Sequence, residues 1–458
     1  MTTFNVINPA TSAVLDQAPD ASPDDAKAAI DRSVGAFAAW KARTPFERSA
    51  ILRKWFELIL QSEDVLARSM TQEMGKPITE SRGEVRYAAA FVEWYAEEAK
   101  RAYGEVIPTH ANHKRMFAMR QPVGPVYAVT PWNFPAAMVT RKVAPALAAG
   151  CTVVLKPAEQ SPLTAIRLAE LWVKAGGPAD VFQVLTTSNP AAVSDMFFAD
   201  ARVRKLTFTG STEVGIKLYE KAARTVKRVS LELGGHAPFI VCDDADVPAA
   251  VQQVMASKFR NAGQTCVCAN RIYVHDKIHS AFTERMADSV KSLRVGDPMS
   301  EQTQVGPLVD QQGLDKVASH VDDAIGKGAK AVIGGRRKDG LFFEPTLLTG
   351  VQQGMRILEE ETFGPVAPIV GYSDEAEIIR AANATPYGLA AYVWTKDLGR
   401  AFRIAEQLEY GIVGINDGIP AVPHAPFGGV KFSGIGREGG PWGMDEYLDI
   451  RYVSIALP

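Results

Sequence analysis

The sequence places one cysteine in a polar turn that contains glycine. Cys266 lies in the stretch FRNAGQTCVCAN (259–270), directly after a Gly, a Gln and a Thr, and Cys268 follows two positions on. A thiol in such a loop can be reached by a ligand, and as a thiolate it is a nucleophile for a carbonyl carbon. The alternative is a small buried side chain, which is what most free cysteines are. This stretch alone leaves both interpretations open.

A glutamate inside an apolar strand is the second candidate for chemistry. Glu232 lies in VSLELGG (229–235), a segment that ends in two glycines. A buried carboxylate is costly unless it is paired or used, and burial raises its pKa toward that of a general base. The alternative is a strand-end glutamate that points into solvent. The apolar neighbours favour the buried general base.

The pattern of strands and helices predicts the scaffold for these residues. Apolar, β-branched segments alternate with helical segments after about residue 126, and a second such series begins after Glu232. This alternation is typical of parallel sheets covered on both faces. We therefore predict an α/β fold with two doubly wound domains and a small additional β element. The N-terminal part is predicted to be helical, with helix starts at Ser22-Pro23 and Thr44-Pro45.

Polar residues and glycines follow three of the predicted strands. Asn133 follows PVYAVT, Lys156 and Glu159 follow TVVL, and Gly210 and Gly215 follow LTFT. In parallel sheets, ligands bind at the carboxyl ends of strands, and a helix that begins there can bind a phosphate through its backbone N–H groups. Ordinary strand-to-helix turns contain the same residue types, so each of these motifs is weak by itself.

Composition excludes several classes of function. The 458 residues carry a formal net charge of −2, and the pI is about 6.4, so no basic field for nucleic acid or an anionic membrane is present. The longest weakly charged run, residues 143–155, is too short to span a bilayer. Four scattered cysteines predict neither a disulfide framework nor a zinc site. Without a secretory signal pattern at the N-terminus, we expect a cytoplasmic protein that binds no metal.

Seven motifs in a fixed order resemble those of the aldehyde dehydrogenase superfamily. They are TPWNFP, LKPAE, FTGSTEVG, LELGG, GQTC, EETFGP and PFGGVKFSG, spread over roughly residues 120–436. Each motif alone is common, but the ordered set is specific. The strongest resemblance is to the bacterial succinate-semialdehyde dehydrogenases, through FRNAGQTCVCANR and WNFPAAMVTRK.

The resemblance implies a catalytic mechanism for the candidate residues. Cys266 would attack the aldehyde carbonyl, and the side-chain amide of Asn133 together with the backbone N–H of Cys266 would form the oxyanion hole. Oxidation of the thiohemiacetal would leave a thioester. Glu232 would activate the water that hydrolyses this thioester, so the product would be an acid and not an acyl-CoA.

The resemblance also implies a nicotinamide cofactor and a division into domains. Residues 1–111 and 126–232 would bind the dinucleotide, residues 233–436 would form the catalytic domain, and residues 112–125 and 437–458 would bridge subunits of a homodimer or homotetramer. Glu159 would repel a 2′-phosphate, which favours NAD over NADP. The implied cofactor-binding residues are Trp132, Lys156, Glu159, Gly210, Ser211, Gly215, Glu361 and Phe363.

The implied substrate carries a carboxylate at the end far from the aldehyde. Arg141 and Arg260 match the two arginines that hold this carboxylate in succinate-semialdehyde dehydrogenases; the alternative for each is an ion pair on a helix surface. The loop at residues 418–424 (GIPAVPH) lacks the serines that assist there. Dehydrogenases of 2-oxoglutarate semialdehyde or glutarate semialdehyde are therefore alternatives.

Other classes of function give different expectations for Cys266. A cysteine hydrolase needs a histidine directed at the thiol, for which His236 and His424 are candidates. A non-catalytic binding protein is also compatible with the fold, since a fold does not determine a function. Within the dehydrogenase interpretation, Cys268 is either inert or the partner of Cys266 in a reversible disulfide that stops catalysis under oxidation.

Overall fold

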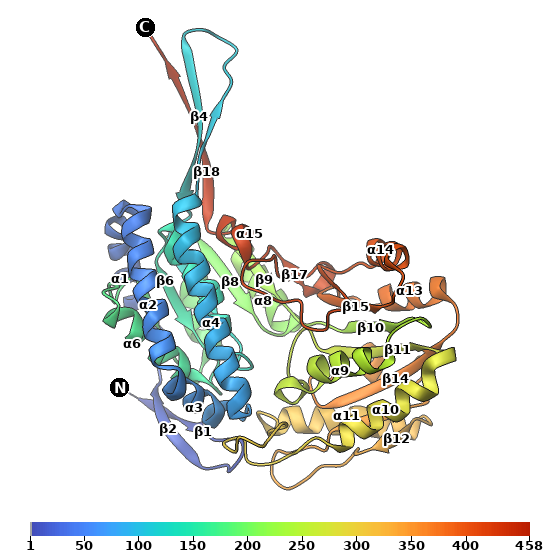
Figure 1. Cartoon of the computed structure of the whole chain (residues 1–458). Coiled ribbons are helices and arrows are strands. Elements are labelled where there is room, and N and C mark those ends of the chain that lie inside the picture. The colour runs from blue at the N-terminus through green and yellow to red at the C-terminus, as the bar shows by residue number, and fades with distance from the viewer. Residues whose placement is uncertain (1) are drawn as a thin grey trace.

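Two large sheets organise the chain, and the chain passes from one to the other between Glu232 and Ala237 (Figure 1). The computed structural model describes residues 2–458. The first sheet has the strand order β17-β9-β8-β5-β6-β7, and the second has β12-β13-β14-β11-β10-β15-β16. The first contains β5 (Val126–Val129), β6 (Val153–Lys156), β7 (Phe182–Val184), β8 (Lys205–Thr209), β9 (Arg228–Glu232) and β17 (Gly434–Ile435). The second contains β10 (Ala237–Val241), β11 (Ala269–His275), β12 (Lys330–Ile333), β13 (Thr346–Thr349), β14 (Val366–Tyr372), β15 (Ala390–Trp394) and β16 (Ile412–Ile415).

The predicted parallel α/β sheets are confirmed, with one antiparallel strand at the edge of each. β12 runs antiparallel to β13, and β17 runs antiparallel to β9, where Gly434 is paired with Glu232. β12 and β17 are therefore exceptions to the parallel arrangement expected for both sheets. A strand at a sheet edge needs to match only one neighbour, so either direction can be accommodated there.

Helices cover both faces of the first sheet, and their predicted starts at Ser22 and Thr44 are confirmed. Ser22 accepts the backbone N–H of Asp25, whose carboxylate accepts the N–H of Ser22, and Thr44 and Glu47 repeat this arrangement. These capping boxes satisfy N–H groups that a helix leaves free at its first turn. The helices are α1 (Pro23–Ala42), α2 (Pro45–Gln61), α3 (Glu63–Met74), α4 (Ile78–Glu98), η1 (Ala99–Arg101), α5 (Ala137–Ala149), α6 (Pro162–Lys174), α7 (Pro190–Ala199) and α8 (Thr212–Ala223).

The second sheet is covered by helices that alternate with its strands. They are α9 (Val247–Lys258), η2 (Arg260–Gly263), η3 (Asp276–Ile278), α10 (His279–Lys291), α11 (Gln311–Gly326), α12 (Arg356–Glu359), α13 (Glu375–Asn383) and α14 (Leu398–Gln407). Two short helices follow the last strand of this sheet, η4 (Lys431–Ser433) and α15 (Gly440–Asp445), and α15 packs against α4 and α5. Two further strands near the N-terminus, β1 (Thr3–Ile7) and β2 (Val14–Pro19), form a separate antiparallel pair.

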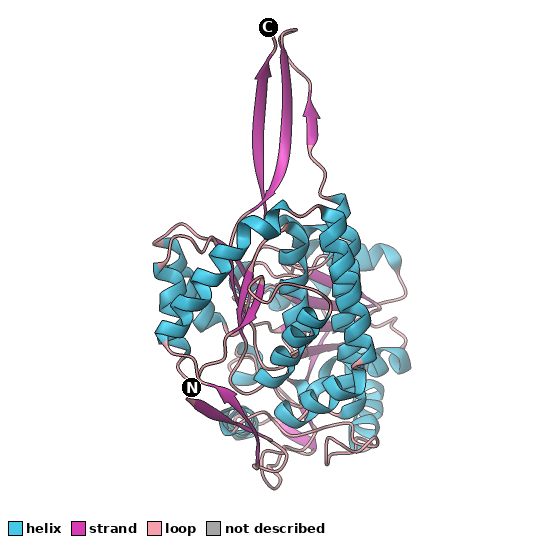
Figure 2. Cartoon of the chain, turned by 90° about the vertical axis from the view of Figure 1, so that its left-hand side faces the viewer, coloured by secondary structure: helices cyan, strands magenta, loops and turns pink. Residues whose placement is uncertain are grey.

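A three-stranded arm projects from the body of the molecule (Figures 1 and 2). It consists of β18 (Leu448–Ala456), β4 (Lys114–Pro122) and β3 (Glu105–Ile107), in that order. Ile450 and Val106 leave 76% and 78% of their surfaces exposed there. Among residues 2–458, β18 has β4 as its only neighbouring strand. In that same part of the chain, no helix combines the length and apolar character needed to cross a membrane.

Candidate active site

A strained loop between the second sheet and its helices carries Cys266. After α9, the three successive residues Asn261, Ala262 and Gly263 have φ angles of 50°, 53° and 74°. Non-glycine residues in this left-handed region cost about 1 kcal/mol or more each, and such strain collects at functional sites. The side chain of Gln264 stabilises the loop: it donates to the carbonyl of Asn261 at 3.0 Å and accepts the N–H of Val309 at 3.0 Å.

Cys266 lies between two cavities, both of which it lines together with Met138. One cavity has a volume of about 300 Å³ and the other about 340 Å³. From the predicted cofactor-binding set, the first is lined by Trp132, Gly210, Ser211, Glu361 and Phe363, and Asn133 lines it as well. The second is lined by both predicted substrate arginines, Arg141 and Arg260. The fold therefore places five of the eight predicted cofactor-binding residues in one cavity and both predicted substrate arginines in another, and Cys266 lines both cavities.

The amide of Asn133 is held beside the Cys266 loop. Asn133 is 4% exposed, and its Nδ2 donates to the carbonyl oxygen of Gln264 at 3.1 Å. An amide nitrogen has two hydrogens, so one remains to donate to a developing oxyanion. Among residues 2–458, the Oδ1 atom has no hydrogen-bond partner.

Glu232 is the last residue of β9, and its side chain is buried rather than directed into solvent. Burial, together with the nearby carboxylate of Glu438, raises the pKa of Glu232 well above the usual range of a glutamate. Its Oε1 atom is so close to the backbone at Gly428 that a Cβ there would approach it to 2.7 Å. A glycine at position 428 therefore leaves room for this carboxyl group.

The thiol of Cys266 needs a base before it can act as a nucleophile. Burial of the sulfur raises its pKa to about 12, and the carboxylates of Glu361 and Glu232 add to this effect, while Arg141 and Arg260 oppose it. The thiol is consequently protonated at neutral pH. This proton must therefore be removed before the sulfur can attack a carbonyl carbon.

In the first cavity, polar groups lie at the start of α8 and in the loop after α12. Ser211 caps α8 by accepting the N–H of Val214 at 3.3 Å. Glu361 accepts the N–H of Gly235 at 3.1 Å, and burial raises its pKa to about 7. The ring of Phe363 packs edge-on against Trp132, with 5.6 Å between ring centroids.

Three residues of the predicted cofactor set lie outside the lining of the first cavity. Lys156 and Glu159 pair with each other at 2.6 Å. Gly215 lies inside α8, where a Cβ would approach the side chain of Leu233 to 2.3 Å. This glycine therefore allows α8 to pack closely against the chain at the end of β9.

The two arginines contact aromatic rings in the second cavity. Arg141 is 2% exposed; its guanidinium lies 3.7 Å from the ring centroid of Phe427, and its Nε lies 2.7 Å from Glu438 Oε2. Its ion pair is thus buried, so the predicted alternative of a helix-surface pair is wrong. Arg260 lies 5.3 Å from the ring of Phe134. Within residues 2–458, Nη2 of Arg141 and Nε of Arg260 have no hydrogen-bond partner.

Glu438 is a charged residue of the site that no local sequence pattern indicates. It accepts a hydrogen bond from Lys142 as well as pairing with Arg141. All three residues are buried, and Glu438 is 296 positions from Lys142 in the sequence. Only a search for charged residues within apolar or glycine-rich segments could have suggested it.

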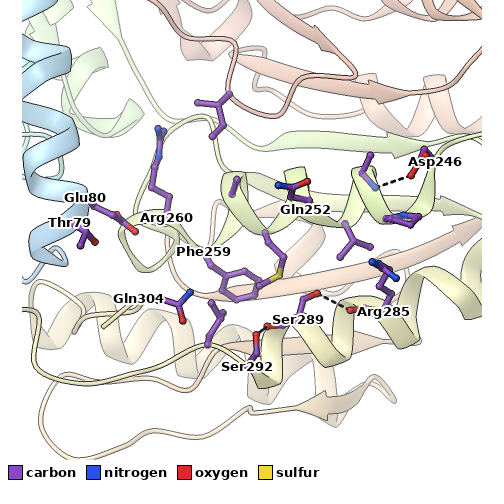
Figure 3. A pocket seen from close by; sticks show the side chains of 17 residues that line it. Thr79, Glu80, Asp246, Gln252, Phe259, Arg260, Arg285, Ser289, Ser292 and Gln304 are labelled. Carbon is purple, nitrogen blue, oxygen red and sulfur yellow. Dashed lines mark hydrogen bonds between the residues drawn. The ribbon is translucent and has the colours of Figure 1, made fainter. Parts of the chain in front are cut away.

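A third and larger cavity, of about 940 Å³, borders the second one (Figure 3). It lies between α9, α10 and the start of α4, and it shares Glu80, Arg260 and Ile419 with the second cavity. Arg260 therefore lies at the boundary between the second cavity and this larger one.

Cys268, His236 and His424 are not placed to take part in a reaction at Cys266. Cys268 is fully buried with its thiol 3.6 Å from the carbonyl of Lys258, and neither it nor Cys266 is in a disulfide. Neither His236 nor His424 lines a cavity that contains Cys266. Residues 2–458 include no group of three or more His, Cys, Asp or Glu side chains arranged to hold a metal ion.

Comparison with known proteins identifies the family. The sequence profile described as "Aldehyde dehydrogenase family" matches residues 1–453. The chain belongs to the aldehyde dehydrogenase family. It is 52% identical over 456 residues to an NADP-dependent succinate-semialdehyde dehydrogenase from Escherichia coli, covering 99% of this chain and 94% of the relative. It is 52% identical to a glutarate-semialdehyde dehydrogenase from Pseudomonas putida, with 99% and 95% covered.

The solved structures agree with this assignment to the aldehyde dehydrogenase family. The crystal structure of succinate-semialdehyde dehydrogenase from Burkholderia pseudomallei matches with a TM-score of 0.98 and 48% identity, covering 100% of this chain and 95% of that one. Aldehyde dehydrogenases use NAD or NADP, and the relatives named above act on semialdehydes that carry a carboxylate. The aldehyde dehydrogenase resemblance noted from the motifs is thus confirmed.

Proposed function

We propose that this enzyme oxidises a short aldehyde with a distal carboxylate, with succinic semialdehyde as the first candidate, to the corresponding acid. The observation that carries the proposal is the second cavity, where Arg141 and Arg260 share the space with Cys266. Guanidinium N–H groups without partners there suit a carboxylate, which binds such groups strongly in a buried setting. The names of the relatives support the same class of substrate.

The proposed reaction uses three residues for its chemical steps. The thiol proton of Cys266 passes to water, and it is the proton released in the net reaction. The sulfur then attacks the aldehyde carbon, while Asn133 and the backbone N–H of Cys266 stabilise the oxyanion. When bound, the nicotinamide supplies the acceptor for the two electrons of the oxidation. Glu232 then takes a proton from water, whose oxygen attacks the thioester, and the acid leaves as the thiol is restored. The net reaction consumes one aldehyde, one NAD⁺ and one water, and yields the acid, NADH and a proton.

The first cavity is suited to hold the nicotinamide end of the cofactor. We propose that Glu361 binds its ribose and that Phe363 and Trp132 contact the ring. Ser211, at the N-terminus of α8, would lie by the pyrophosphate, where helix N–H groups favour negative charge. Lys156 and Glu159 would bind the adenosine ribose, in the unit that contains the first sheet.

The loop at residues 418–424 bears on the chain length of the semialdehyde that the second cavity accepts. Ile419 and Ala421 line the second cavity, so the loop at residues 418–424 contributes apolar side chains where serines would supply hydroxyl groups. Glutarate semialdehyde and 2-oxoglutarate semialdehyde are the alternatives that this loop leaves open. A comparison of kcat/KM for the three semialdehydes orders them directly.

We expect the Arg260→Gln variant to lose kcat/KM for succinic semialdehyde by about 10- to 100-fold, because a charged hydrogen bond contributes about 1.5–3 kcal/mol. Butanal, which has the same chain length without the carboxylate, should be oxidised at the wild-type kcat/KM. The measurement is the initial rate of nicotinamide reduction with each aldehyde. Arg285→Gln, at an exposed position on the far side of the larger cavity, is the matched control. Equal losses with both aldehydes would contradict the carboxylate-binding role.

We propose NAD as the preferred cofactor, and Glu159 as the reason. A carboxylate beside the ribose repels the doubly charged 2′-phosphate of NADP, although the pairing with Lys156 reduces its effect. The Glu159→Ser variant should therefore raise kcat/KM for NADP by about 10-fold relative to NAD, which corresponds to about 1.4 kcal/mol. Initial rates at varied NAD and NADP test this. A wild-type enzyme that already prefers NADP would contradict the proposal.

The proposed assembly is a homodimer or homotetramer, and the proposed location is the cytoplasm. The arm supports self-association because it exposes Ile450 and Tyr452 on β18, whose outer edge is open, and Val106 on β3. Exposed apolar side chains at an unpaired strand edge favour association with another chain.

A further inference from the structure

Three charged residues at the start of α4 make contact with both sides of the Cys266 site. Lys76 lies just before the helix, and Glu80 and Glu84 lie on its first two turns. All three line the second cavity. None of them belongs to the catalytic or cofactor-binding residues proposed above, and their side chains extend to Asn133 and to the loop that precedes Cys266.

On one side, Lys76 and Glu84 fix the segment that carries Asn133. The Nζ of Lys76 donates to the carbonyl oxygen of Asn133 at 2.8 Å and also pairs with Glu84. Glu84 accepts the backbone N–H groups of Ala136 and Ala137, at 3.0 and 3.1 Å, at the start of α5. Lys76 and Glu84 are 1% and 3% exposed, so water does not compete for these contacts. Lys76 and Glu84 therefore hold the backbone at Asn133 and at the start of α5, which follows it.

On the other side, Glu80 fixes the strained loop. Its Oε2 accepts the backbone N–H of Asn261 at 2.7 Å, the first of the three left-handed residues before Cys266. Figure 3 shows Glu80 on α4 beside the loop that carries Arg260. The side chain of Asn261 in turn donates to the carbonyls of Asn133 and Gln264, at 3.1 and 3.2 Å. The contacts from α4 thus meet at the Asn133 carbonyl.

We propose that Lys76, Glu80 and Glu84 are positioning residues that set the placement of Asn133 relative to the backbone N–H of Cys266. This inference rests on the proposed function, in which these two donors bind the oxyanion. Donors act strongly on a transition state only when they are fixed before the charge develops. The two donors come from different α/β units, so the distance between them depends on contacts that cross from one unit to the other.

The double variant Lys76→Met/Glu84→Gln removes the hydrogen bond to the Asn133 carbonyl and neutralises the partner of Lys76, so neither residue of this pair keeps an unpaired buried charge. We expect kcat to fall by about 10- to 100-fold with both succinic semialdehyde and butanal, because displaced donors lose transition-state stabilisation. The KM for NAD should stay within about twofold of the wild-type value. If Lys76 instead bound the substrate carboxylate, KM would rise for succinic semialdehyde alone, and the proposal would be overturned.

Glu73 offers a matched structural control. Like Glu84, it is a buried carboxylate that accepts two successive backbone N–H groups at a helix start, those of Leu163 and Thr164 at 2.7 and 3.1 Å. It lines neither cavity at Cys266. The Glu73→Gln variant should lower the melting temperature while keeping kcat. If both variants lose kcat in proportion to their loss of melting temperature, the role of Lys76 and Glu84 is only structural.

Two variants of Glu80 distinguish a positioning role from a proton-transfer role. The second role needs a test because burial raises the pKa of Glu80 to about 7, close to neutral pH. A glutamine at position 80 can still accept the N–H of Asn261, whereas an alanine cannot. Positioning predicts near-wild-type kcat for Glu80→Gln and a loss of about 10-fold or more for Glu80→Ala. Equal losses in both variants would overturn it. A wild-type enzyme that oxidises no aldehyde would instead refute the proposed function, which separates the two failures.

Discussion

The Cys266→Ala variant is expected to lose aldehyde oxidation by at least about 10⁴-fold in kcat, because no other group in the site can form the covalent intermediate. Cys151, Cys242 and Cys268 are all fully buried, and none of them lines the cavities at Cys266. The measurement is NADH formation from succinic semialdehyde, both in the steady state and in the first turnover. No burst of NADH should be seen.

The control for this variant is Cys268→Ala, two positions away. Within residues 2–458, the thiol of Cys268 makes one hydrogen bond, to the backbone carbonyl of Lys258. Loss of this thiol should therefore leave kcat within a few-fold of the wild-type value. Both variants should keep the wild-type circular dichroism spectrum. Substantial oxidation by Cys266→Ala would refute the covalent mechanism.

The Glu232→Gln variant is expected to separate the two halves of the reaction. Removing a general base costs about 10²- to 10⁴-fold, and the loss should fall mainly on thioester hydrolysis. A first-turnover burst of NADH should therefore persist, followed by a slow steady state. In the wild type, the raised pKa of Glu232 means that the carboxyl is protonated at low pH, so kcat should fall as the pH falls through that pKa. This pH dependence should disappear in the variant.

The outcome with Glu232→Gln also tests which proton the carboxylate takes first. A variant with neither burst nor turnover would show that Glu232 is needed to deprotonate Cys266, whose pKa is raised to about 12. Comparison with Cys266→Ala at several pH values distinguishes these cases. A fast steady state at neutral pH would exclude both roles.

Local patterns in the sequence predict the elements well and the polar contacts between them poorly. The strand ends that carry Asn133 and Glu232 follow from short apolar runs, and the caps at Ser22 and Thr44 follow from neighbours three residues away. Cys266 is placed by a motif whose residues are contiguous. The boundary between α2 and α3 is not revealed by the sequence, because Ser62 alone separates the two helices, no proline follows it, and its side chain makes no capping hydrogen bond.

The charged network of the site could not be predicted because its members are far apart in the chain. Lys76 and Asn133 are 57 positions apart, and Lys142 and Glu438 are 296 apart. A buried charge can be stabilised by any suitably placed partner, so the sequence around one partner says nothing of the other. Such pairs become visible only once the sheets bring distant segments together.

The antiparallel pairing of β17 with β9 has a consequence for the order in which the protein is made. Glu232 is paired with Gly434, so the strand that carries this carboxylate gains its outer neighbour only about 200 residues later. At about 5–20 residues per second, a ribosome needs roughly 10–40 s to synthesise that interval. Throughout this time, the first sheet presents an open edge at β9, and the arm strand β4 still lacks β18. The nascent chain therefore cannot complete its active site until the segment that contains Gly434 and Glu438 has been synthesised.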